Sequence, residues 1–162
     1  MTRECAEIDP NYKQIIVYSI FRFGDLVFRY KRSSRSGETR LHSFCSIGIG
    51  GHVKRQDVPL EVKSILEIFD LARVREAQEE FDFTWTGKPV LLGVLNDESN
   101  SVGKVHLGIV YEYWLASAIV RPREYRTPID CGFVSIPELM PHSLEYETWS
   151  QIIIKDHLSS RD

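Results

Sequence analysis

The sequence predicts one globular domain of mixed α and β structure, either α+β or an α/β sandwich. Segments with strand character outnumber those with helix character, and the helical segments lie in the middle and at the end of the chain. The length of 162 residues, with 43% hydrophobic and 27% charged residues, is that of a single compact domain. We therefore expect residues 1–162 to form one domain, with residues 1–12 as an N-terminal extension.

The first part of the chain predicts a β-hairpin and a third strand. Residues 14–21 and 26–30 are rich in β-branched and aromatic side chains, and a Gly-Asp turn signal separates them. The polar segment 33–43 predicts a loop, and residues 44–49 predict the next strand. We expect that strand to end at three glycines, Gly48, Gly50 and Gly51.

A helix of about 15 residues is predicted within residues 64–81, because this segment lacks glycine and proline and its apolar residues recur at helical spacing. Residues 90–95 and 104–115 predict two strands that pair across a polar loop. Four prolines divide residues 121–141 into loop and short strand. Residues 143–158 predict a closing helix.

Charge and cysteine content argue against several classes of protein. Twenty Lys and Arg against 23 Asp and Glu give a formal net charge of −3, so no overall positive field exists to bind nucleic acid or an anionic membrane. The cysteines at 5, 45 and 131 form no Cys-x-x-Cys pair, which argues against disulfides and a structural zinc site. The chain also shows neither a secretory signal nor a membrane-spanning stretch. We expect a cytoplasmic protein without a membrane partner.

The predicted central helix carries three acidic residues, Glu76, Glu79 and Glu80. At about 100° per residue they lie opposite the apolar stripe, which we expect to be Leu71, Val74, Ala77 and Phe81. Like charges at this spacing repel one another, and the macrodipole disfavours negative charge late in a helix. Mg²⁺ or Mn²⁺ would remove both penalties, because these ions take oxygen ligands. A solvated acidic face is the alternative interpretation.

This segment resembles the signature of the Nudix hydrolase family, G-x5-E-x7-R-E-U-x-E-E-x-G-U, in which U is a bulky aliphatic or aromatic residue. Arg75-Glu76, Glu79-Glu80 and Phe83 match in type and spacing, and Glu67 stands at the family's spacing before Arg75. The resemblance extends to residues 46–53, 96–100 and 102–108, which are similar to a bacterial subgroup of predicted phosphoesterases.

The sequence departs from the Nudix signature in three places. Ala77 replaces a bulky residue, Asp82 replaces the glycine, and 15 residues separate Gly51 from Glu67, which implies an insertion from Lys54 to about Leu66. Residues 64–67, Ser-Ile-Leu-Glu, also read as a capping box. We therefore favour a structural role for Glu67 at the start of the helix.

The resemblance implies an α/β/α sandwich with a mixed β-sheet, and hydrolysis of a diphosphate linkage in a nucleoside diphosphate derivative. It implies that Mg²⁺ or Mn²⁺ is held by Glu76, Glu79 and Glu80, of which Glu80 is the strongest candidate ligand, and by the backbone carbonyl of Gly51. Glu76 and Glu79 would also position the catalytic base. Arg75 matches the arginine that orients these carboxylates.

Many Nudix enzymes use one further carboxylate outside the signature as a metal ligand or base. Glu98 and Glu112 are the candidates here, followed by Asp97. His52 and His106 can contact phosphate or metal, but we favour structural roles for both.

Two other functions stay open. The departures from the signature fit a catalytically inactive Nudix-fold module that binds a nucleotide or regulates a partner. An isomerase acting on isopentenyl diphosphate shares the fold, but Cys45 is the nearest candidate for its acid, and its placement is unconvincing. For the partner we expect a small-molecule nucleoside diphosphate derivative, and a homodimer is compatible with the sequence.

Overall fold

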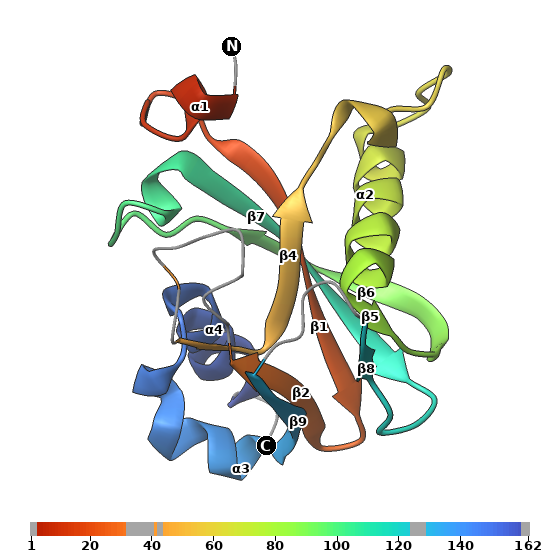
Figure 1. Cartoon of the computed structure of the whole chain (residues 1–162), viewed down its shortest axis with the longest axis vertical. Coiled ribbons are helices and arrows are strands. Elements are labelled where there is room, and N and C mark those ends of the chain that lie inside the picture. The colour runs from red at the N-terminus through yellow and green to blue at the C-terminus, as the bar shows by residue number, and fades with distance from the viewer. Residues whose placement is uncertain (1–2, 32–40, 42–43, 124–128, 160–162) are drawn as a thin grey trace.

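The computed structural model of the protein describes residues 3–31, 41, 44–123 and 129–159. Seven strands form its main sheet (Figure 1): β1 (Gln14–Phe23), β2 (Leu26–Lys31), β3 (Cys45–Ser46), β4 (Gly48–His52), β6 (Trp85–Leu95), β7 (His106–Leu115) and β9 (Ile129–Ser135). The order is β3-β2-β1-β7-β6, with β4 paired to β1 and β9 to β2. The β1–β7 pair is parallel and the other described pairs are antiparallel, so the sheet is mixed.

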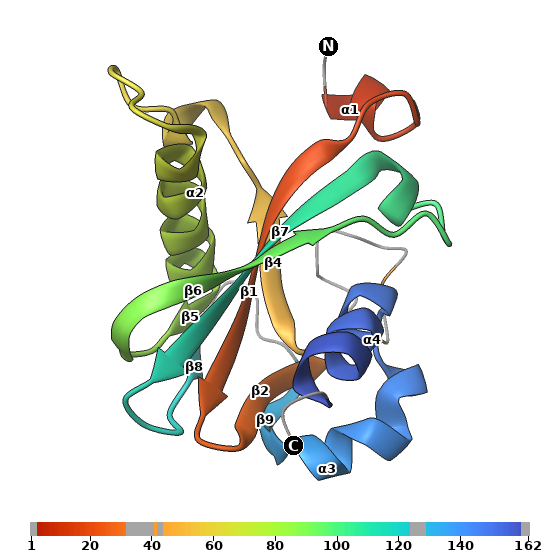
Figure 2. The same ribbon diagram turned by 180° about the vertical axis from the view of Figure 1, so that it is seen from behind.

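Helices cover both faces of this sheet (Figures 1 and 2). The long helix α2 (Ile65–Glu80) lies on one face. The other face carries α3 (Ile136–Leu139), α4 (Thr148–Ile153) and the π-helical turn η5 (Ile154–Leu158). The remaining elements are α1 (Arg3–Ala6), η2 (Arg55–Asp57), η3 (Gly103–Val105), η4 (Met140–Glu145) and a two-stranded sheet of β5 (Phe81–Asp82) with β8 (Arg121–Pro122). The predicted sandwich with a mixed sheet is confirmed.

Strand alternation divides the hydrophobic core into two layers. Tyr18 and Val110 point toward α4 and pack with Trp149, whereas Phe21 and Tyr111 point toward α2. Successive side chains of a strand face opposite sides of the sheet, so β1 and β7 supply both layers. Each large apolar side chain that is fully buried in these layers contributes about 1.5–3 kcal/mol. The sheet therefore provides the packed surface against which α2 lies.

The predicted hairpin and central helix are confirmed. β1 and β2 pair directly, and Gly24 turns between them with a φ of 57°, which favours glycine. α2 begins after Ser64, whose hydroxyl accepts a hydrogen bond from the backbone N–H of Glu67. The Glu67 carboxylate accepts one from the backbone N–H of Lys63 at 3.1 Å, so it turns back to the helix start. The loop predicted at 33–43 lies outside the described residues except for position 41.

The prediction that three glycines end the third strand was wrong. Gly48, Gly50 and Gly51 lie within β4, which runs to His52. A β-carbon at position 48 would lie 2.0 Å from a ring carbon of Tyr18. Glycine is therefore required here because neighbouring side chains cross the strand closely.

The second half of the chain contains more regular structure than the sequence predicts. β6 begins at Trp85 rather than at residue 90, and the segment 121–141 contains the seven-residue strand β9 and helix α3. Pro137 lies in the first turn of α3, where the missing N–H of proline breaks no helical bond. The closing helix begins at Thr148, where the Glu147 carboxylate accepts a hydrogen bond from the backbone N–H of Trp149 at 3.0 Å.

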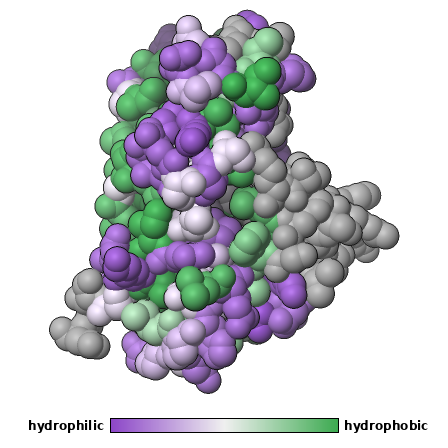
Figure 3. All heavy atoms as spheres, turned by 90° about the vertical axis from the view of Figure 1, so that its left-hand side faces the viewer, coloured by the Kyte–Doolittle hydropathy of each residue, from purple (hydrophilic) through white to green (hydrophobic). Residues whose placement is uncertain are grey.

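No helix in the described part of the chain combines the length and the apolar character required to span a bilayer. Cys5, Cys45 and Cys131 are free thiols. Figure 3 shows hydrophobic atoms gathered along one side of the face that it presents. The edge strand β6 exposes four hydrophobic side chains, Trp85, Val90, Leu91 and Val94.

Candidate functional site

The face that α2 turns toward the sheet carries both apolar and charged residues, so the predicted apolar stripe is confirmed only in part. Ala77 and Phe81 are buried as expected, but Leu71 is 46% exposed and Glu76 only 6% exposed. The buried residues of the helix are Ala72, Arg73, Glu76 and Ala77. The prediction that all three glutamates lie on the exposed face was therefore wrong for Glu76.

Small residues and paired charges explain this orientation of α2. Ala72 and Ala77 let the helix approach the sheet closely. The Arg73 guanidinium carbon lies 5.0 Å from the centre of the Tyr111 ring, and Arg73 also donates a hydrogen bond to the Tyr113 hydroxyl. A buried cation needs such partners to offset its desolvation. The helix thus buries charged groups because the sheet supplies aromatic and hydroxyl partners for them.

Gly51 of β4 makes room for the Glu76 carboxylate. A β-carbon at position 51 would lie 1.9 Å from the carboxylate carbon of Glu76. Such an approach is impossible for any residue with a side chain, so glycine is required here by contact rather than by backbone angle. The structure thus brings together two residues of the predicted metal site, Gly51 and Glu76.

Arg75 connects α2 to β4 and to the inserted segment. Its Nε and Nη2 atoms donate to the two carboxylate oxygens of Asp57 at 2.6 and 2.7 Å. Nη1 donates to Glu76 at 2.6 Å and to Glu79 at 3.2 Å. Nη2 also donates to the backbone carbonyl of His52 at 3.0 Å. Arg75 therefore fixes both carboxylates, and its orienting role in catalysis stays a prediction.

Asp57 is a residue of this site that the sequence analysis missed. It lies in η2, inside the insertion, and is 3% exposed. Burial opposes its ionisation, but hydrogen bonds from Arg75 and from the backbone N–H of Lys54 hold the pKa of Asp57 below its ordinary value. The hydrogen bond to Asp57 likewise raises the pKa of Arg75. An isolated aspartate in an insertion gives no sequence pattern by which this partner could be found.

Replacement of Asp57 by asparagine is expected to destabilise the protein in a pH-dependent way. The folded-state pKa of Asp57 is lowered, so its ionised form stabilises the fold above its unfolded pKa near about 4, and this contribution is lost as pH falls through the folded pKa. We expect Asp57→Asn to cost about 2 kcal/mol of unfolding free energy at pH 7, and less below about pH 4. Urea unfolding across pH 2.5–7.5 measures this.

Asp25→Asn is the matched control, because Asp25 is exposed in the β1–β2 turn. A deficit for Asp57→Asn that stays constant across this pH range, or that equals the control, would contradict the assignment.

Lys54 lies between two of the predicted metal-binding glutamates. Its Nζ is 3.3 Å from Glu76 Oε1 and 3.6 Å from Glu79 Oε2. Glu79 is about half exposed, whereas Glu76 is buried. The two carboxylates thus converge on one cationic group, and this group comes from the first residue of the insertion. The sequence analysis missed this lysine as well.

Glu80 does not share this arrangement. It is half-buried at the end of α2, and its backbone carbonyl accepts a hydrogen bond from the N–H of Arg123 at 2.9 Å. Among the described residues, Glu76, Glu79 and Glu80 do not form a group of three converging ligand atoms.

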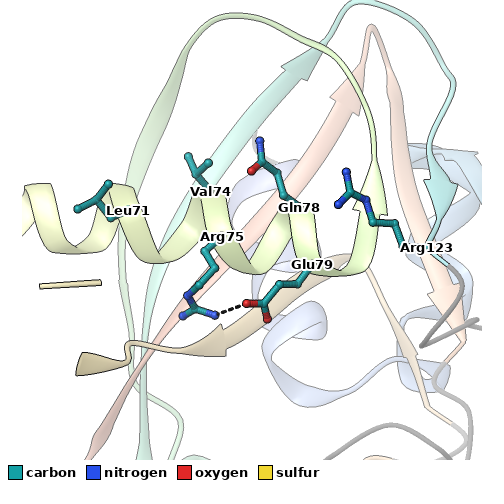
Figure 4. Close-up of a pocket in the computed structure, with 6 residues that line it drawn as sticks. All are labelled: Leu71, Val74, Arg75, Gln78, Glu79 and Arg123. Atoms are coloured by element: carbon teal, nitrogen blue, oxygen red, sulfur yellow. Dashed lines mark hydrogen bonds and ion pairs between the residues drawn. The ribbon is translucent and has the colours of Figure 1, made fainter. Parts of the chain in front are cut away.

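An open pocket of about 450 Å³ lies along the outer side of α2. Figure 4 shows six residues that line it, and Arg75 and Glu79 point toward one another at its edge. Leu71 and Val74 form the apolar part of the lining, and Arg123 approaches from the end of β8. Leu71 and Val74 therefore form part of a shallow, open surface beside Glu79.

The three carboxylates predicted outside the signature lie away from α2. Glu112 is 1% exposed on the sheet face that α4 covers, where it pairs with Arg22 at 3.5 Å and His157 at 3.2 Å. Glu98 is ion-paired with Lys13 at 3.3 Å, in the β6–β7 connection on the opposite side of the molecule from α2 (Figures 1 and 2).

Asp97 lies in the same β6–β7 connection, where hydrogen bonds from neighbouring residues hold its carboxylate. It accepts a hydrogen bond from the hydroxyl of Thr148 at 2.6 Å and one from the backbone N–H of Ser99 at 2.9 Å. The structure therefore brings none of these three carboxylates to Glu76 and Glu79.

The two histidines named as secondary candidates come together. The Nε2 atoms of His52 and His106 lie 3.2 Å apart on the sheet face opposite α2. With Glu7 they form the group of three potential metal ligands that the described residues contain.

Comparisons with known proteins agree with this fold. No family model matches the chain. Protein YmaB of Bacillus subtilis (strain 168) is 35% identical over 158 residues, which cover 95% of this chain and 75% of YmaB. The crystal structure of Tm1382, classed as a Nudix hydrolase, is similar with a TM-score of 0.79 and 28% identity, over 99% of this chain and 78% of Tm1382. The MutT protein of Methanosarcina mazei Go1 shares the fold, with a TM-score of 0.62 and 17% identity over 92% of this chain and 94% of MutT. The chain therefore belongs to the Nudix hydrolase superfamily, in the same family as YmaB.

Proposed function

We propose that this Nudix hydrolase cleaves a diphosphate linkage in a nucleoside diphosphate derivative, and that it uses Mg²⁺ or Mn²⁺. The observation that carries the proposal is the convergence of Glu76 and Glu79 on one cationic group, 3.3 and 3.6 Å away, at the edge of an open pocket. Both glutamates stand at matching positions of the family signature.

The donor atoms at this place suit a hard divalent cation. Carboxylate oxygens are the preferred protein ligands of Mg²⁺ and Mn²⁺, and Glu79 is accessible from the pocket. We propose Glu76, Glu79, Glu80 and the Gly51 carbonyl as the ligands. A divalent cation held there would neutralise phosphate charge and lower the pKa of a bound water.

The surrounding residues support binding of a phosphorylated substrate. Arg75 holds Glu76 and Glu79 in one orientation, so little reorganisation is needed when substrate binds. Arg123 is ion-paired with Asp82 and presents a guanidinium at the pocket, where its planar group of donors matches phosphate oxygens. Leu71 and Val74 offer apolar surface for a base or another uncharged moiety.

A substrate panel tests this proposal. The protein is incubated with nucleoside diphosphate sugars, dinucleoside polyphosphates, nucleoside triphosphates and ADP-ribose, each with Mg²⁺, with Mn²⁺, or with EDTA. Phosphate release is measured with and without added phosphatase, because cleavage within a diphosphate creates new monoesters that the phosphatase then hydrolyses. Metal-dependent release in the coupled assay is the expected result. Metal-independent release, or none across the panel, would contradict the proposal.

A binding or regulatory module is the second candidate, and Lys54 is the observation that favours it. Lys54 and Arg75 already neutralise Glu76 and Glu79, as a metal ion would. Calorimetry distinguishes the two functions on the same panel. A nucleotide that binds without metal-dependent product release would favour the module.

Removal of the Lys54 charge is expected to strengthen metal binding at α2. An ammonium so close to two carboxylates competes with a divalent cation for the same oxygens. We expect Lys54→Ala to bind Mn²⁺ about tenfold more tightly, which corresponds to about 1.4 kcal/mol. Titration calorimetry measures the affinity, and Lys88→Ala on the exposed edge strand is the control. Equal or weaker Mn²⁺ binding by Lys54→Ala would show that the carboxylates do not hold the ion.

We further propose that residues 1–162 act as one domain, that the protein works in the cytoplasm, and that its partner is a small phosphorylated molecule rather than nucleic acid. The net charge of −3 and the free thiols support the last two points. A homodimer stays a prediction.

A further inference from the structure

We propose that Glu7, His52 and His106 form a second metal site, separate from α2, that binds a transition-metal ion such as Zn²⁺. Their potential ligand atoms all lie within 4.8 Å of one another. His52 Nε2 and His106 Nε2 are 3.2 Å apart, and Glu7 Oε1 lies 3.8 Å from the first and 4.0 Å from the second. Two imidazoles and one carboxylate are a ligand set that zinc takes in proteins.

The fold brings these residues together from three distant parts of the chain. His52 is the last residue of β4 and His106 the first of β7, and both strands pair with β1 near its start. Glu7 follows α1, which lies beside these strand ends (Figure 1). Side-chain alternation directs both histidines to the sheet face opposite α2. A β-carbon at Gly50 or at Gly108, which share this face, would lie 3.0 Å from Tyr18 or 2.8 Å from Trp149.

The hydrogen bond at the other ring nitrogen prepares His106 for a metal. His106 Nδ1 lies 2.8 Å from the backbone carbonyl oxygen of Val102. A carbonyl oxygen only accepts hydrogen bonds, so Nδ1 carries the proton. In the neutral ring the lone pair is then on Nε2, the atom that faces His52 and Glu7. A histidine that ligates a metal commonly donates its second N–H to a carbonyl in this way.

The separation of the two ring nitrogens fits a tetrahedral site. With metal–nitrogen bonds of about 2.0–2.1 Å, a tetrahedral ion holds two nitrogens about 3.3 Å apart, and the observed separation is 3.2 Å. The Glu7 oxygen would need to approach by about 0.5 Å for a carboxylate bond of about 2.0–2.2 Å. The Glu7 side chain is 25% exposed, so it has room for this shift.

Hydrogen bonding alone is the competing explanation. His52 Nε2–H can donate to His106 Nε2, and the Gln14 amide lies 3.4 Å from the same atom. In that arrangement the three side chains would bind no ion. Measuring metal binding by the isolated protein therefore distinguishes the two explanations.

Metal binding by the full chain, stripped of metal by EDTA and dialysed, tests the proposal. Zn²⁺ affinity and stoichiometry are measured by calorimetry, and Co²⁺ is added as a spectroscopic probe. We expect one equivalent of Zn²⁺ at this site and the intense visible absorption of tetrahedral Co²⁺. Glu7→Gln and His52→Gln are each expected to weaken Zn²⁺ binding at least tenfold and to reduce the Co²⁺ absorption.

Two matched control variants remove potential metal ligands that lie outside this site. His142→Gln removes an exposed histidine that pairs with Glu145 elsewhere, and Glu79→Gln removes a carboxylate of α2. Both are expected to retain the Zn²⁺ affinity and the Co²⁺ spectrum. His106 is 4% exposed, and its replacement would disturb the buried sheet, so the test rests on the more exposed Glu7 and His52. Circular dichroism verifies the fold of each variant.

Two results would overturn the proposal. One is Zn²⁺ binding and Co²⁺ absorption that are unchanged in both Glu7→Gln and His52→Gln. The other is a loss of Zn²⁺ binding in Glu79→Gln or His142→Gln equal to that in His52→Gln. Hydrolysis at α2 is tested separately, by the substrate panel with Mg²⁺ or Mn²⁺, so failure of this proposal and failure of the proposed function are distinguishable.

Discussion

Glu80→Gln is expected to lower metal-dependent turnover at least about 100-fold, which corresponds to about 2.7 kcal/mol of transition-state stabilisation. Glu80 stands at the end of α2, at the signature position that the resemblance assigns to the metal. Glutamine keeps the shape of the side chain but removes the negative charge that a divalent cation requires. The measurement is the initial rate with the best substrate of the panel, at saturating Mg²⁺ or Mn²⁺.

Two controls show whether the effect of Glu80→Gln comes from a general change in net charge or from unfolding. Glu61→Gln removes an exposed glutamate from the loop before α2 and is expected to keep the rate of the wild type. Circular dichroism and thermal unfolding show whether Glu80→Gln remains folded. If the folded Glu80→Gln variant keeps wild-type turnover, Glu80 is not a ligand of the catalytic ion.

Gly51→Ala is expected to be the most disruptive single methyl addition in the site. The new β-carbon would lie 1.9 Å from the Glu76 carboxylate carbon and 2.2 Å from its Oε2. Glu76 is buried and bonded to Arg75, so it cannot move away without losing that partner. We expect a loss of about 1–3 kcal/mol in unfolding free energy, typical of overpacking, together with loss of turnover. Urea unfolding and the coupled assay measure the two effects.

A double-mutant cycle tests whether the contact with Glu76 causes the loss of stability in Gly51→Ala. Shortening Glu76 to alanine removes the atoms with which the new methyl group collides, so Gly51→Ala should cost much less in that background. Gly132→Ala in β9 is the matched control, since a β-carbon there meets no atom within 4 Å. Equal costs of Gly51→Ala in the two backgrounds would show that the contact with Glu76 is not the cause.

The sequence predicts the framework of this fold well, because the relevant signals are local. Strand composition marks β1 and β2, and the turn at Gly24 joins them. The start of α2 was also predictable, since Ser64 and Glu67 form a recognised capping pattern. Helix α3 was not, because Pro137, a residue type that usually interrupts structure, stands here at a helix start.

The sequence identifies the helix of the candidate site but not the geometry around it, and the roles of the predicted site residues stay predictions. The Arg75–Glu80 pattern identifies the helix, yet helical periodicity assigns hydrophobic residues to the core and so places Glu76 outside. In the structure, contacts with Gly51 and Arg75 outweigh that preference. Lys54 and Asp57 were missed because their partners are distant in sequence, and single-sequence patterns carry no information about such pairs.

The parallel pairing of β1 with β7 has a consequence for how the chain folds. Gln14 pairs opposite His106, which lies 92 residues further along the chain, so β1 meets this neighbour only after the segments between them have been made. During synthesis the apolar side chains of β1 lack this partner until β7 has been made. Contacts between such distant segments also form slowly. Fragments that stop before β7 should therefore aggregate rather than fold, and chaperone binding to the nascent chain should peak while the β6–β7 connection is still inside the ribosome.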